Sequence, residues 1–325
     1  MIKAVKKVAI FASSFVFLFA AAMTVAACNN DNSLSEPPTE TEKKFPAKET
    51  DGYTSVYDGG YTGVVHRVEN AESGNSIYGR IFTKDDSFDQ TKKYPLLIMS
   101  HGYNGVALDA NSEMVQTALD AGMVVYSYDF CGGSAMSKSE GKVTEMSVET
   151  EISDLESVMA EISSLPYIDS EKVVLFGHSF GGLVSGLTAA RHKDDIIGLI
   201  LHAPAFGGVV NKGNSPYAST DEIPETVKNG NLVVGKVFYE DMWNLYPYEE
   251  IVKFDKPVYI MYGSEDKPQD EAEAAYNGRE VPVSPSCEVH VVEGAGHNFS
   301  NEEYASLADS VTEYLRNVGA VVQNG

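Results

Sequence analysis

Three residues of this sequence have the types and local settings that nucleophilic catalysis needs. Ser179 is the central residue of a G-x-S-x-G pentapeptide at positions 177–181 (GHSFG). A serine hydroxyl is a weak nucleophile until a base takes its proton, and His297, on a glycine-rich stretch, suits that role. Asp266, shortly after Gly263, would accept the other imidazole proton and hold the ring in one tautomer. Together these residues predict acyl transfer through a covalent intermediate.

Each of these assignments has a structural alternative. A G-x-S-x-G pentapeptide also arises by chance, so the motif carries weight only together with its partners. Asp266 is preferred to Glu265 because of its spacing from Gly263, and Asp270 and Glu271 are weaker candidates. The remaining histidines border expected strands, lie inside one or are peripheral. We expect structural roles for all of them, namely His66, His101, His178, His192, His202 and His290.

Acyl transfer also needs backbone N–H groups that point at the developing oxyanion. Phe180 directly follows the serine and opens an expected helix, so its N–H is one predicted donor. The second is expected from Tyr103, within residues 100–105 (SHGYNG), which follow an earlier strand.

An aromatic-rich segment at about 204–250 interrupts an otherwise regular chain. A connection of this length in a compact domain is usually functional, and we expect a partly helical cap. Its Tyr239 and Trp243 are candidate substrate-binding residues that would line an apolar or aromatic acyl site. The alternative is that these rings simply pack the cap onto its domain.

Alternating strands and helices must position these residues. Helical periodicity predicts helices at about 111–121 and 148–165, and a last helix from Ser300, where Glu303 completes a capping box. Such alternation predicts an α/β fold with a mostly parallel sheet that helices cover on both faces. Ligands in such folds lie beyond the carboxyl ends of the strands. The expected strands are 61–69, 76–83, 95–100, 123–128, 173–178, 197–202, 257–262 and 288–292.

The N-terminal residues predict export and tethering. Residues 1–27 combine lysines, a long apolar run and a small-residue end (VAAC), and resemble the bacterial lipoprotein signal peptide. Cleavage before Cys28 would make that cysteine the site of lipid attachment, with a polar, flexible linker at 28–52 and a folded domain at 53–320. The alternative is an uncleaved anchor with an incidental cysteine. Either way we expect a protein held by its N-terminus at the outer face of a bacterial membrane.

Charge and cysteine content limit the possible partners. The chain carries 24 basic and 47 acidic residues, a net charge of −23, which argues against nucleic acid and anionic lipid head groups as partners. No cluster of cysteine and histidine predicts a metal site. Cys131 and Cys287 lie on distant expected strands, and we expect buried thiols rather than a disulfide.

From about residue 61 to residue 315 the chain resembles the α/β-hydrolase superfamily. The H-G, G-x-S-x-G, G-x-x-D and G-x-G-H motifs, and the order of the serine, acid and histidine, carry the resemblance. Within it, residues 129–134 (DFCGGS), the H-G-Y-N-G loop and the cap location are similar to bacterial serine aminopeptidase-like and cinnamoyl (feruloyl) esterase-like hydrolases. The usual DxxGxGxS-type loop here has the sequence DFCGGSAMS, a departure next to the pocket.

The resemblance implies an eight-stranded, mainly parallel sheet with the cap between strands 6 and 7 and with Ser179 at a sharp turn. It implies serine-dependent cleavage of small-molecule carboxylic esters, hydroxycinnamoyl esters among them, without a cofactor. Two alternatives stay open at this point. One is a serine aminopeptidase-like enzyme that releases N-terminal residues, and the other is a non-catalytic, ligand-binding lipoprotein.

Overall fold

The computed structural model describes residues 50–108, 112–266, 270–277 and 287–321. The expected signal peptide, Cys28 and nearly all of the expected linker lie outside these residues. Among the described helices, none is long and apolar enough to cross a bilayer.

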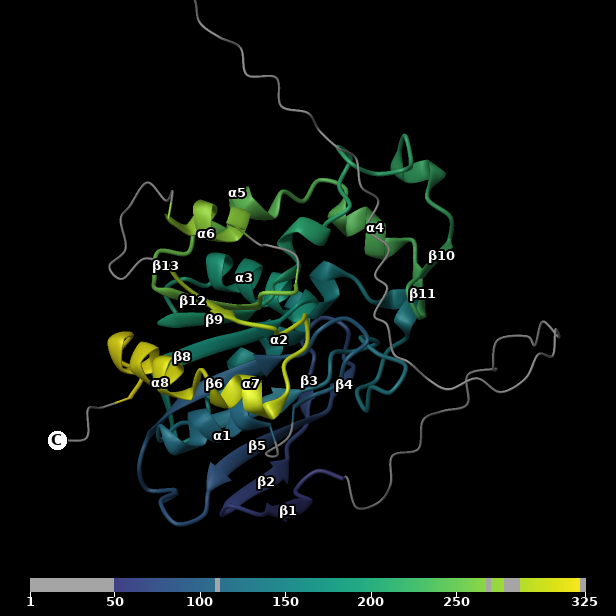
Figure 1. Cartoon of the computed structure of the whole chain (residues 1–325). Coiled ribbons are helices and arrows are strands. Elements are labelled where there is room, and N and C mark those ends of the chain that lie inside the picture. Colours follow the sequence, from purple (N-terminus) through teal and green to yellow (C-terminus); the bar gives the residue numbers. More distant parts are fainter. Residues whose placement is uncertain (1–49, 109–111, 267–269, 278–286, 322–325) are drawn as a thin grey trace, which may run out of the picture.

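In the described residues a nine-stranded sheet forms the centre of the molecule (Figure 1), with strand order β1-β2-β5-β7-β6-β8-β9-β12-β13. From β7 to β13 every neighbouring pair is parallel, whereas β1, β2 and β5 join antiparallel at one side. The predicted mostly parallel α/β sheet is confirmed. The strands are β1 (Thr54–Tyr57), β2 (Tyr61–Val65), β5 (Gly79–Lys84), β6 (Tyr94–Ser100), β7 (Val124–Tyr128), β8 (Ile168–His178), β9 (Gly198–His202), β12 (Val258–Gly263) and β13 (Cys287–Val292).

The central strands are apolar on both faces because each face is covered. Side chains alternate along a strand, so Leu96 and Ile98 of β6 enter one hydrophobic core while Leu97 and Met99 enter the other. All of them are almost completely buried. Such continuous apolar runs are typical of parallel strands between two helical layers.

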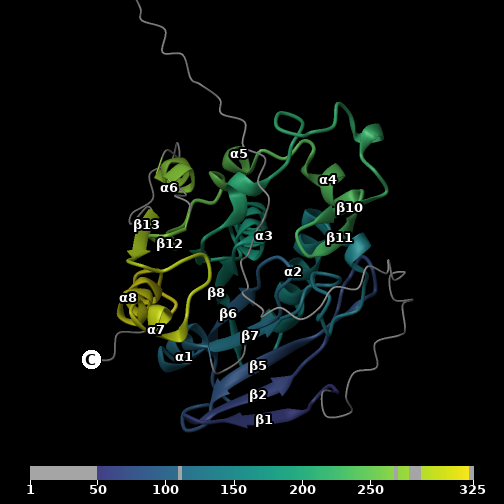
Figure 2. The same cartoon turned by 45° about the vertical axis from the view of Figure 1, so that its right-hand side comes forward.

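Helices form the two outer layers (Figures 1 and 2). On one face lie α1 (Glu113–Asp120), α7 (Asn301–Ala305) and α8 (Ala308–Asn317). On the other lie α2 (Val148–Ser163) and α3 (Phe180–Arg191), with α6 (Asp270–Asn277) beside the far end of the sheet.

In the central sheet and in the last helix, two details differ from expectation. The sheet has one strand more than the eight that were expected, because β1 adds an outer strand whose half-exposed residues gave no apolar signal. The last helix opens with the predicted Ser300–Glu303 capping box but divides into α7 and α8. At the break the Ser306 hydroxyl donates to the Glu303 carbonyl at 2.6 Å, and such local bonds compete with regular helix hydrogen bonding.

The segment between β9 and β12 forms the cap (Figure 2), drawn in green above α2 and α3. It is only partly helical, because a two-stranded hairpin of β10 (Thr226–Asn229) and β11 (Leu232–Gly235) lies within it. Its helical parts are η3 (Ala205–Gly208), η4 (Thr220–Glu222), α4 (Val237–Met242) and α5 (Pro247–Ile251). A second small hairpin, β3 (Val68–Glu69) with β4 (Ser76–Ile77), lies in the connection from β2 to β5, and η2 (Val143–Glu145) precedes α2.

The two cysteines lie far apart in the fold. Cys131 is buried in the loop after β7, whereas Cys287 is half-buried at the start of β13. In the described part of the chain no disulfide joins them. The expectation of a fully buried thiol therefore holds for Cys131 but not for Cys287, which the outermost strand leaves partly open.

Candidate active site

Ser179 occupies a sharp turn between a strand and a helix. β8 ends at His178 and α3 begins at Phe180, so one residue joins the two elements. Its backbone has φ 53° and ψ −116°, a combination that residues other than glycine rarely adopt. Its N–H donates to the His202 carbonyl at 2.9 Å, and its carbonyl accepts the Ala205 N–H at 2.9 Å. Backbone bonds to the end of β9 and the segment after it therefore hold the strained residue in place.

The glycines on both sides of Ser179 allow this turn. A Cβ atom at Gly177 would lie 2.3 Å from the Gly181 carbonyl oxygen. A Cβ atom at Gly181 would lie 2.3 Å from the His101 carbonyl oxygen. Only glycine lets the start of α3 pack this closely on β8 and on the loop after β6.

Ser179, His297 and Asp266 form one hydrogen-bonded chain. Ser179 Oγ lies 2.9 Å from His297 Nε2, and His297 Nδ1 lies 2.8 Å from Asp266 Oδ2. Because an ionised carboxylate can only accept, Nδ1 carries the proton and Nε2 accepts the serine O–H. Ser179 is 4% exposed, whereas the His297 side chain is 35% exposed. Water therefore reaches the base more readily than the nucleophile.

Two facing loops, after β12 and β13, position the acid and the base. The Glu265 N–H donates to the Ala295 carbonyl at 2.9 Å, and the Asp266 N–H turns back to the Gly263 carbonyl at 3.0 Å. A Cβ atom on Gly263 would lie 2.1 Å from the Ala295 oxygen, so the loops approach closely only at a glycine. Glu265 itself is exposed, and the preferred acid is the one that meets the histidine. The side chains of the weaker candidates, Asp270 and Glu271, lie outside the described part of the structure.

His178 supports the loop that carries His297. Its Nε2 lies 3.1 Å from the His297 carbonyl oxygen, and its ring centroid lies 4.4 Å from that of His202. Burial, reinforced by the neighbouring His297, lowers the pKa of His178 to about 4, so the neutral ring donates to that carbonyl. His202 in turn bonds the Tyr304 hydroxyl through Nδ1 at 2.8 Å. Sequence reasoning gave His178 only a structural role, although its place next to the serine was a usable signal.

Both expected oxyanion donors lie beside Ser179. Phe180 is the first residue of α3, where N–H groups have no partner within the helix. Gly102, just before Tyr103, lies so near that a Cβ atom on it would be 3.1 Å from Ser179 Cβ. The structure thus brings Gly102, the residue before Tyr103, against Ser179, while Phe180 follows the serine directly.

Residues 102–105 form a tight turn that fixes the backbone on both sides of Tyr103. The Gly105 N–H donates to the Gly102 carbonyl at 2.9 Å, and Asn104 adopts a left-handed φ of 56°. The Asn104 N–H donates to the Gly133 carbonyl at 3.1 Å. Positive φ at the third position of a turn is typical of type II, which Asn tolerates.

The loop of residues 129–134 is braced by acids rather than open to substrate. Asp129 accepts the N–H groups of Ala107 and Lys138, each at 2.7 Å. Asp154 accepts the Cys131 N–H at 2.7 Å, and burial raises the pKa of Asp154 to about 6. Although the sequence DFCGGSAMS departs from the usual loop, its first residue, Asp129, is an acid with a structural role.

Comparisons with known proteins bear on the fold that carries this site. Residues 91–236 match the family model described as serine aminopeptidase, S33. Est1E from Butyrivibrio proteoclasticus, solved with ferulic acid bound, superposes with a TM-score of 0.67 at 19% identity, covering 78% of this chain and 99% of that one. An alpha/beta hydrolase from Penicillium sp. sh18, GrgF, superposes with a TM-score of 0.55 at 16% identity, covering 79% and 97%.

This chain has the α/β-hydrolase fold. Dipeptidyl-peptidase 5 of Schizosaccharomyces pombe is 29% identical over 227 residues, which are 66% of this chain and 31% of that protein. The chain thus spans about a third of the length of the curated relatives that it matches. In an α/β-hydrolase fold the residues after β6, β8, β12 and β13 meet at the carboxyl edge of the sheet, where Ser179, His297 and Asp266 are found.

Aromatic rings from the α/β-hydrolase core and from the cap meet next to Ser179. Phe180 stacks on Phe238 of α4 with ring centroids 5.6 Å apart, and Tyr103 lies edge-on to Phe238 at 5.9 Å. Tyr239 extends this cluster, with its ring 5.4 Å from Phe238. In the described part of the chain no ring contact joins Trp243 to it. Of the two candidate substrate-binding residues, the structure therefore brings only Tyr239 into the cluster.

Within the described residues, no group of histidine, cysteine and acidic side chains is arranged to hold a metal ion.

Proposed function

We propose that this protein is a serine hydrolase that cleaves carboxylic esters through an acyl-enzyme intermediate. The observation that carries the proposal is the hydrogen-bonded chain from Ser179 through His297 to Asp266, with distances of 2.9 and 2.8 Å. Nucleophile, base and orienting acid are the set that makes a serine hydroxyl reactive.

The reaction would proceed in two halves. Ser179 Oγ attacks the ester carbonyl while His297 Nε2 takes its proton, and the N–H groups of Phe180 and Tyr103 hold the oxyanion. The imidazolium, stabilised by Asp266, then protonates the leaving alcohol. In the second half His297 takes a proton from water, which attacks the acyl-enzyme, and returns it to Ser179. The 35% exposure of the His297 side chain suits the entry of that water.

The aromatic cluster supports aromatic acyl groups as substrates. Phe180, which directly follows the nucleophile, stacks on Phe238 of the cap, and Tyr239 lies beside Phe238, so an acyl group bound at Ser179 would lie at the edge of an aromatic cluster. The similarity to Est1E, solved with ferulic acid bound, agrees with hydroxycinnamoyl esters as the substrate class.

A peptidase is the second candidate, because the matched family model and the fission yeast relative both carry peptidase names. An aminopeptidase needs an acidic group to bind the substrate amine. The cap acids open to that role, Asp221, Glu222 and Glu225, are all exposed to solvent, and Glu222 accepts the Ala218 N–H at 3.2 Å. We therefore place ester cleavage first.

A panel of substrates tests this order. Methyl esters of hydroxycinnamic acids and p-nitrophenyl esters are compared with aminoacyl p-nitroanilides, each with the protein and with its Ser179→Ala variant. We expect kcat/KM for the esters to exceed that for the amides by at least about tenfold, a difference of about 1.4 kcal/mol. Faster cleavage of the aminoacyl amides would indicate that the protein is a peptidase. Binding of these esters without turnover would favour the non-catalytic lipoprotein.

The N-terminal residues bear on the location of the protein. We propose that residues 1–27 act as a lipoprotein signal peptide and that Cys28 is lipidated, so the enzyme would act while tethered at the outer face of a bacterial membrane.

A further inference from the structure

The side chain of Tyr103 connects the predicted oxyanion turn to the cap. Its hydroxyl donates to the carbonyl of Asn229 at 3.0 Å. Asn229 is the last residue of β10, next to the turn of the cap hairpin, and lies 126 positions further along the chain. The backbone N–H of Tyr103 is thus a predicted oxyanion donor, while its side chain binds the cap.

The ring of Tyr103 packs against one ring from the core and one from the cap. It lies edge-on to Phe180 at 6.1 Å, which belongs to the turn around the nucleophile, and edge-on to Phe238 of the cap at 5.9 Å. Phe180 and Phe238 are 6% and 4% exposed, so the rings pack against one another without intervening solvent. A shift of the cap hairpin would therefore displace the Tyr103 ring.

The backbone around Tyr103 is constrained on its other side. Asn104 Oδ1 accepts the Ser134 hydroxyl at 3.2 Å, and the Asn104 N–H is bound by the Gly133 carbonyl. The turn is therefore anchored to the core through Asn104 and to the cap through Tyr103. The carbonyl of the peptide before Tyr103 accepts the Gly105 N–H at 2.9 Å and lies 2.8 Å from His101 Nδ1. The cap contact adds an anchor on the side chain of the residue that carries the N–H of this peptide.

Asn229 is itself fixed within the cap. It pairs with Leu232 across the hairpin. Gly230, in the turn that follows, has a φ of 56°. The carbonyl that accepts the Tyr103 hydroxyl is thus positioned by the hairpin turn.

We propose that Tyr103 is a positioning residue through which the cap hairpin helps to set the geometry of the oxyanion hole. This inference rests on the proposed serine hydrolase function. Loss of the Tyr103–Asn229 hydrogen bond would leave ester binding largely intact and weaken stabilisation of the tetrahedral intermediate. The effect should therefore fall on kcat rather than on KM.

Tyr103→Phe removes the hydroxyl and keeps the ring. With p-nitrophenyl acetate we expect kcat to fall about 5- to 20-fold, between the loss of one hydrogen bond and the loss of an oxyanion donor, with KM within about twofold. The matched control is Tyr126→Phe, which removes a hydroxyl that donates to the His66 carbonyl at 2.8 Å on a strand away from the serine. We expect it to leave kcat unchanged while costing similar stability.

A double-mutant cycle tests the link to the hairpin. Gly230→Ala strains the hairpin turn at its left-handed φ and should lower kcat in the native background by about two- to fivefold. In the Tyr103→Phe background the same change should have no further effect on kcat, because the contact is already lost.

The outcomes separate this inference from the proposed function. Absence of Ser179-dependent turnover in the native protein overturns the function itself. Turnover with unchanged kcat in Tyr103→Phe, or with independent and multiplying effects of the two substitutions, overturns only the role of Tyr103. A rise in KM alone would also contradict it, since that would indicate a substrate contact.

Discussion

At the scale of single residues, the backbone of Ser179 is the least ordinary feature of the molecule. A residue at φ 53° and ψ −116° costs on the order of 1–3 kcal/mol, which the surrounding structure must offset. The hydrogen bonds of the Ser179 N–H and carbonyl groups contribute to this, and the flanking glycines avoid steric clashes. The strain places the hydroxyl at the start of α3 and within 2.9 Å of His297.

The contact between His178 and His297 leads to a prediction at the same scale. His178→Ala removes the donor to the His297 carbonyl and the ring packed beside it, so we expect kcat to fall about tenfold as the catalytic loop loses its support. His178→Gln, which keeps an amide donor of similar reach, should restore most of the activity. Equal activity of all three proteins in steady-state ester hydrolysis would contradict a supporting role of His178 in catalysis.

Burial of His178 also predicts a pH dependence of stability. Its folded pKa of about 4 is lower than the ordinary value of 6.5, so the unfolded chain binds the proton first as the pH falls. The stability contribution is therefore complete above about pH 6.5 and is lost toward pH 4. His178→Gln should show a shallower decline of the free energy of unfolding across this window in urea titrations. Other buried groups are common to both proteins, so parallel curves would contradict the assignment.

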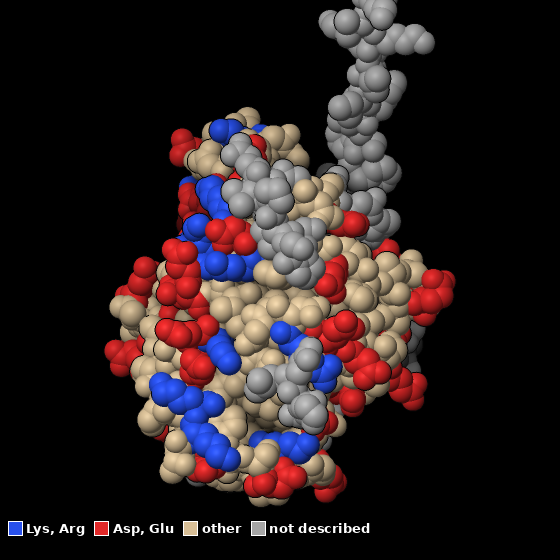
Figure 3. Space-filling model, turned by 90° about the vertical axis from the view of Figure 1, so that its left-hand side faces the viewer, with Lys and Arg blue, Asp and Glu red and all other residues tan. Residues whose placement is uncertain are grey.

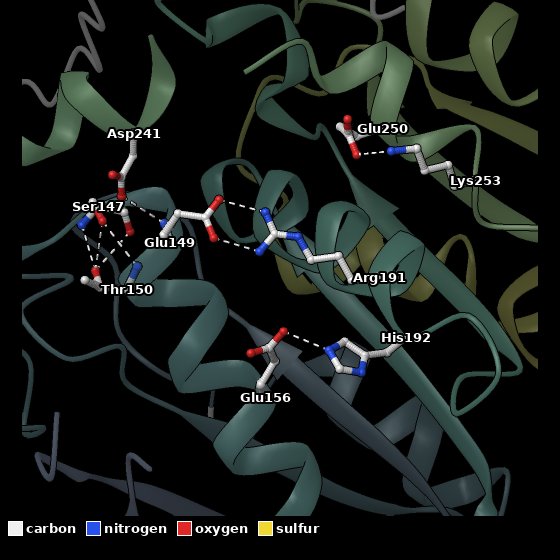
Figure 4. Close-up of polar contacts among 9 residues, drawn as sticks. All are labelled: Ser147, Glu149, Thr150, Glu156, Arg191, His192, Asp241, Glu250 and Lys253. Carbon is white, nitrogen blue, oxygen red and sulfur yellow. Dashed lines mark hydrogen bonds and ion pairs between the residues drawn. The ribbon is translucent and has the colours of Figure 1, made fainter. Parts of the chain in front are cut away.

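At the scale of elements, polar contacts join α2, α3 and the cap (Figure 4). Arg191 at the end of α3 makes a two-bonded ion pair with Glu149 in the first turn of α2, both at 2.7 Å. The Glu149 N–H donates to Asp241 of α4 at 3.3 Å. His192 reaches Glu156 further along α2 at 2.8 Å. A carboxylate at a helix N-terminus is favourable, so Asp241 helps to dock the cap on α2.

Substitutions at this junction should change stability and leave the chemistry alone. Because the Arg191 and Glu149 side chains are 40% and 49% exposed, solvent weakens their attraction, and we expect Arg191→Ala to cost only about 0.5–1 kcal/mol. The cost should shrink at high salt in thermal or urea unfolding. Lys253→Ala, which removes a more exposed pair with Glu250, is the control and should cost about 0–0.5 kcal/mol. Equal losses of stability in the two variants would contradict the prediction that the Arg191–Glu149 pair helps to hold the junction together.

Local patterns predicted most elements, and long-range contacts account for what they missed. The apolar runs of β6 to β9, the Ser300 capping box and the chain order of Ser179, Asp266 and His297 are all readable from short stretches. The bond from Tyr103 to Asn229 is not, because its partners are 126 positions apart and meet only through the cap. The β10–β11 hairpin was also missed, because its strands have only four residues each and β11 is a short apolar run without alternation of apolar and polar side chains.

At the scale of the whole molecule, charge is the dominant surface property. Figure 3 shows acidic side chains spread over one face, with basic ones in several separate groups between them. The net charge of −23 creates a negative potential around the protein. Such a field should repel anionic substrates and leave neutral ones unaffected.

Ionic strength therefore distinguishes two kinds of ester. For mono-p-nitrophenyl succinate, an anion, kcat/KM should rise about two- to fivefold between about 20 mM and 300 mM salt as the repulsion is screened. For neutral p-nitrophenyl acetate it should stay constant over the same range. A fall of kcat/KM for the anion with salt would indicate a positive site at the pocket and contradict the prediction.

The most direct test of the central claim is the time course of p-nitrophenyl acetate hydrolysis by the purified protein beside its Ser179→Ala variant. We expect turnover by the native protein and a loss of at least about 10⁴-fold in kcat in the variant, as expected when the nucleophile of such a site is removed. Both proteins should unfold at similar temperatures, which excludes misfolding as the cause. Turnover that survives in the variant, or turnover by neither protein, would contradict the assignment of Ser179 as the nucleophile of an esterase.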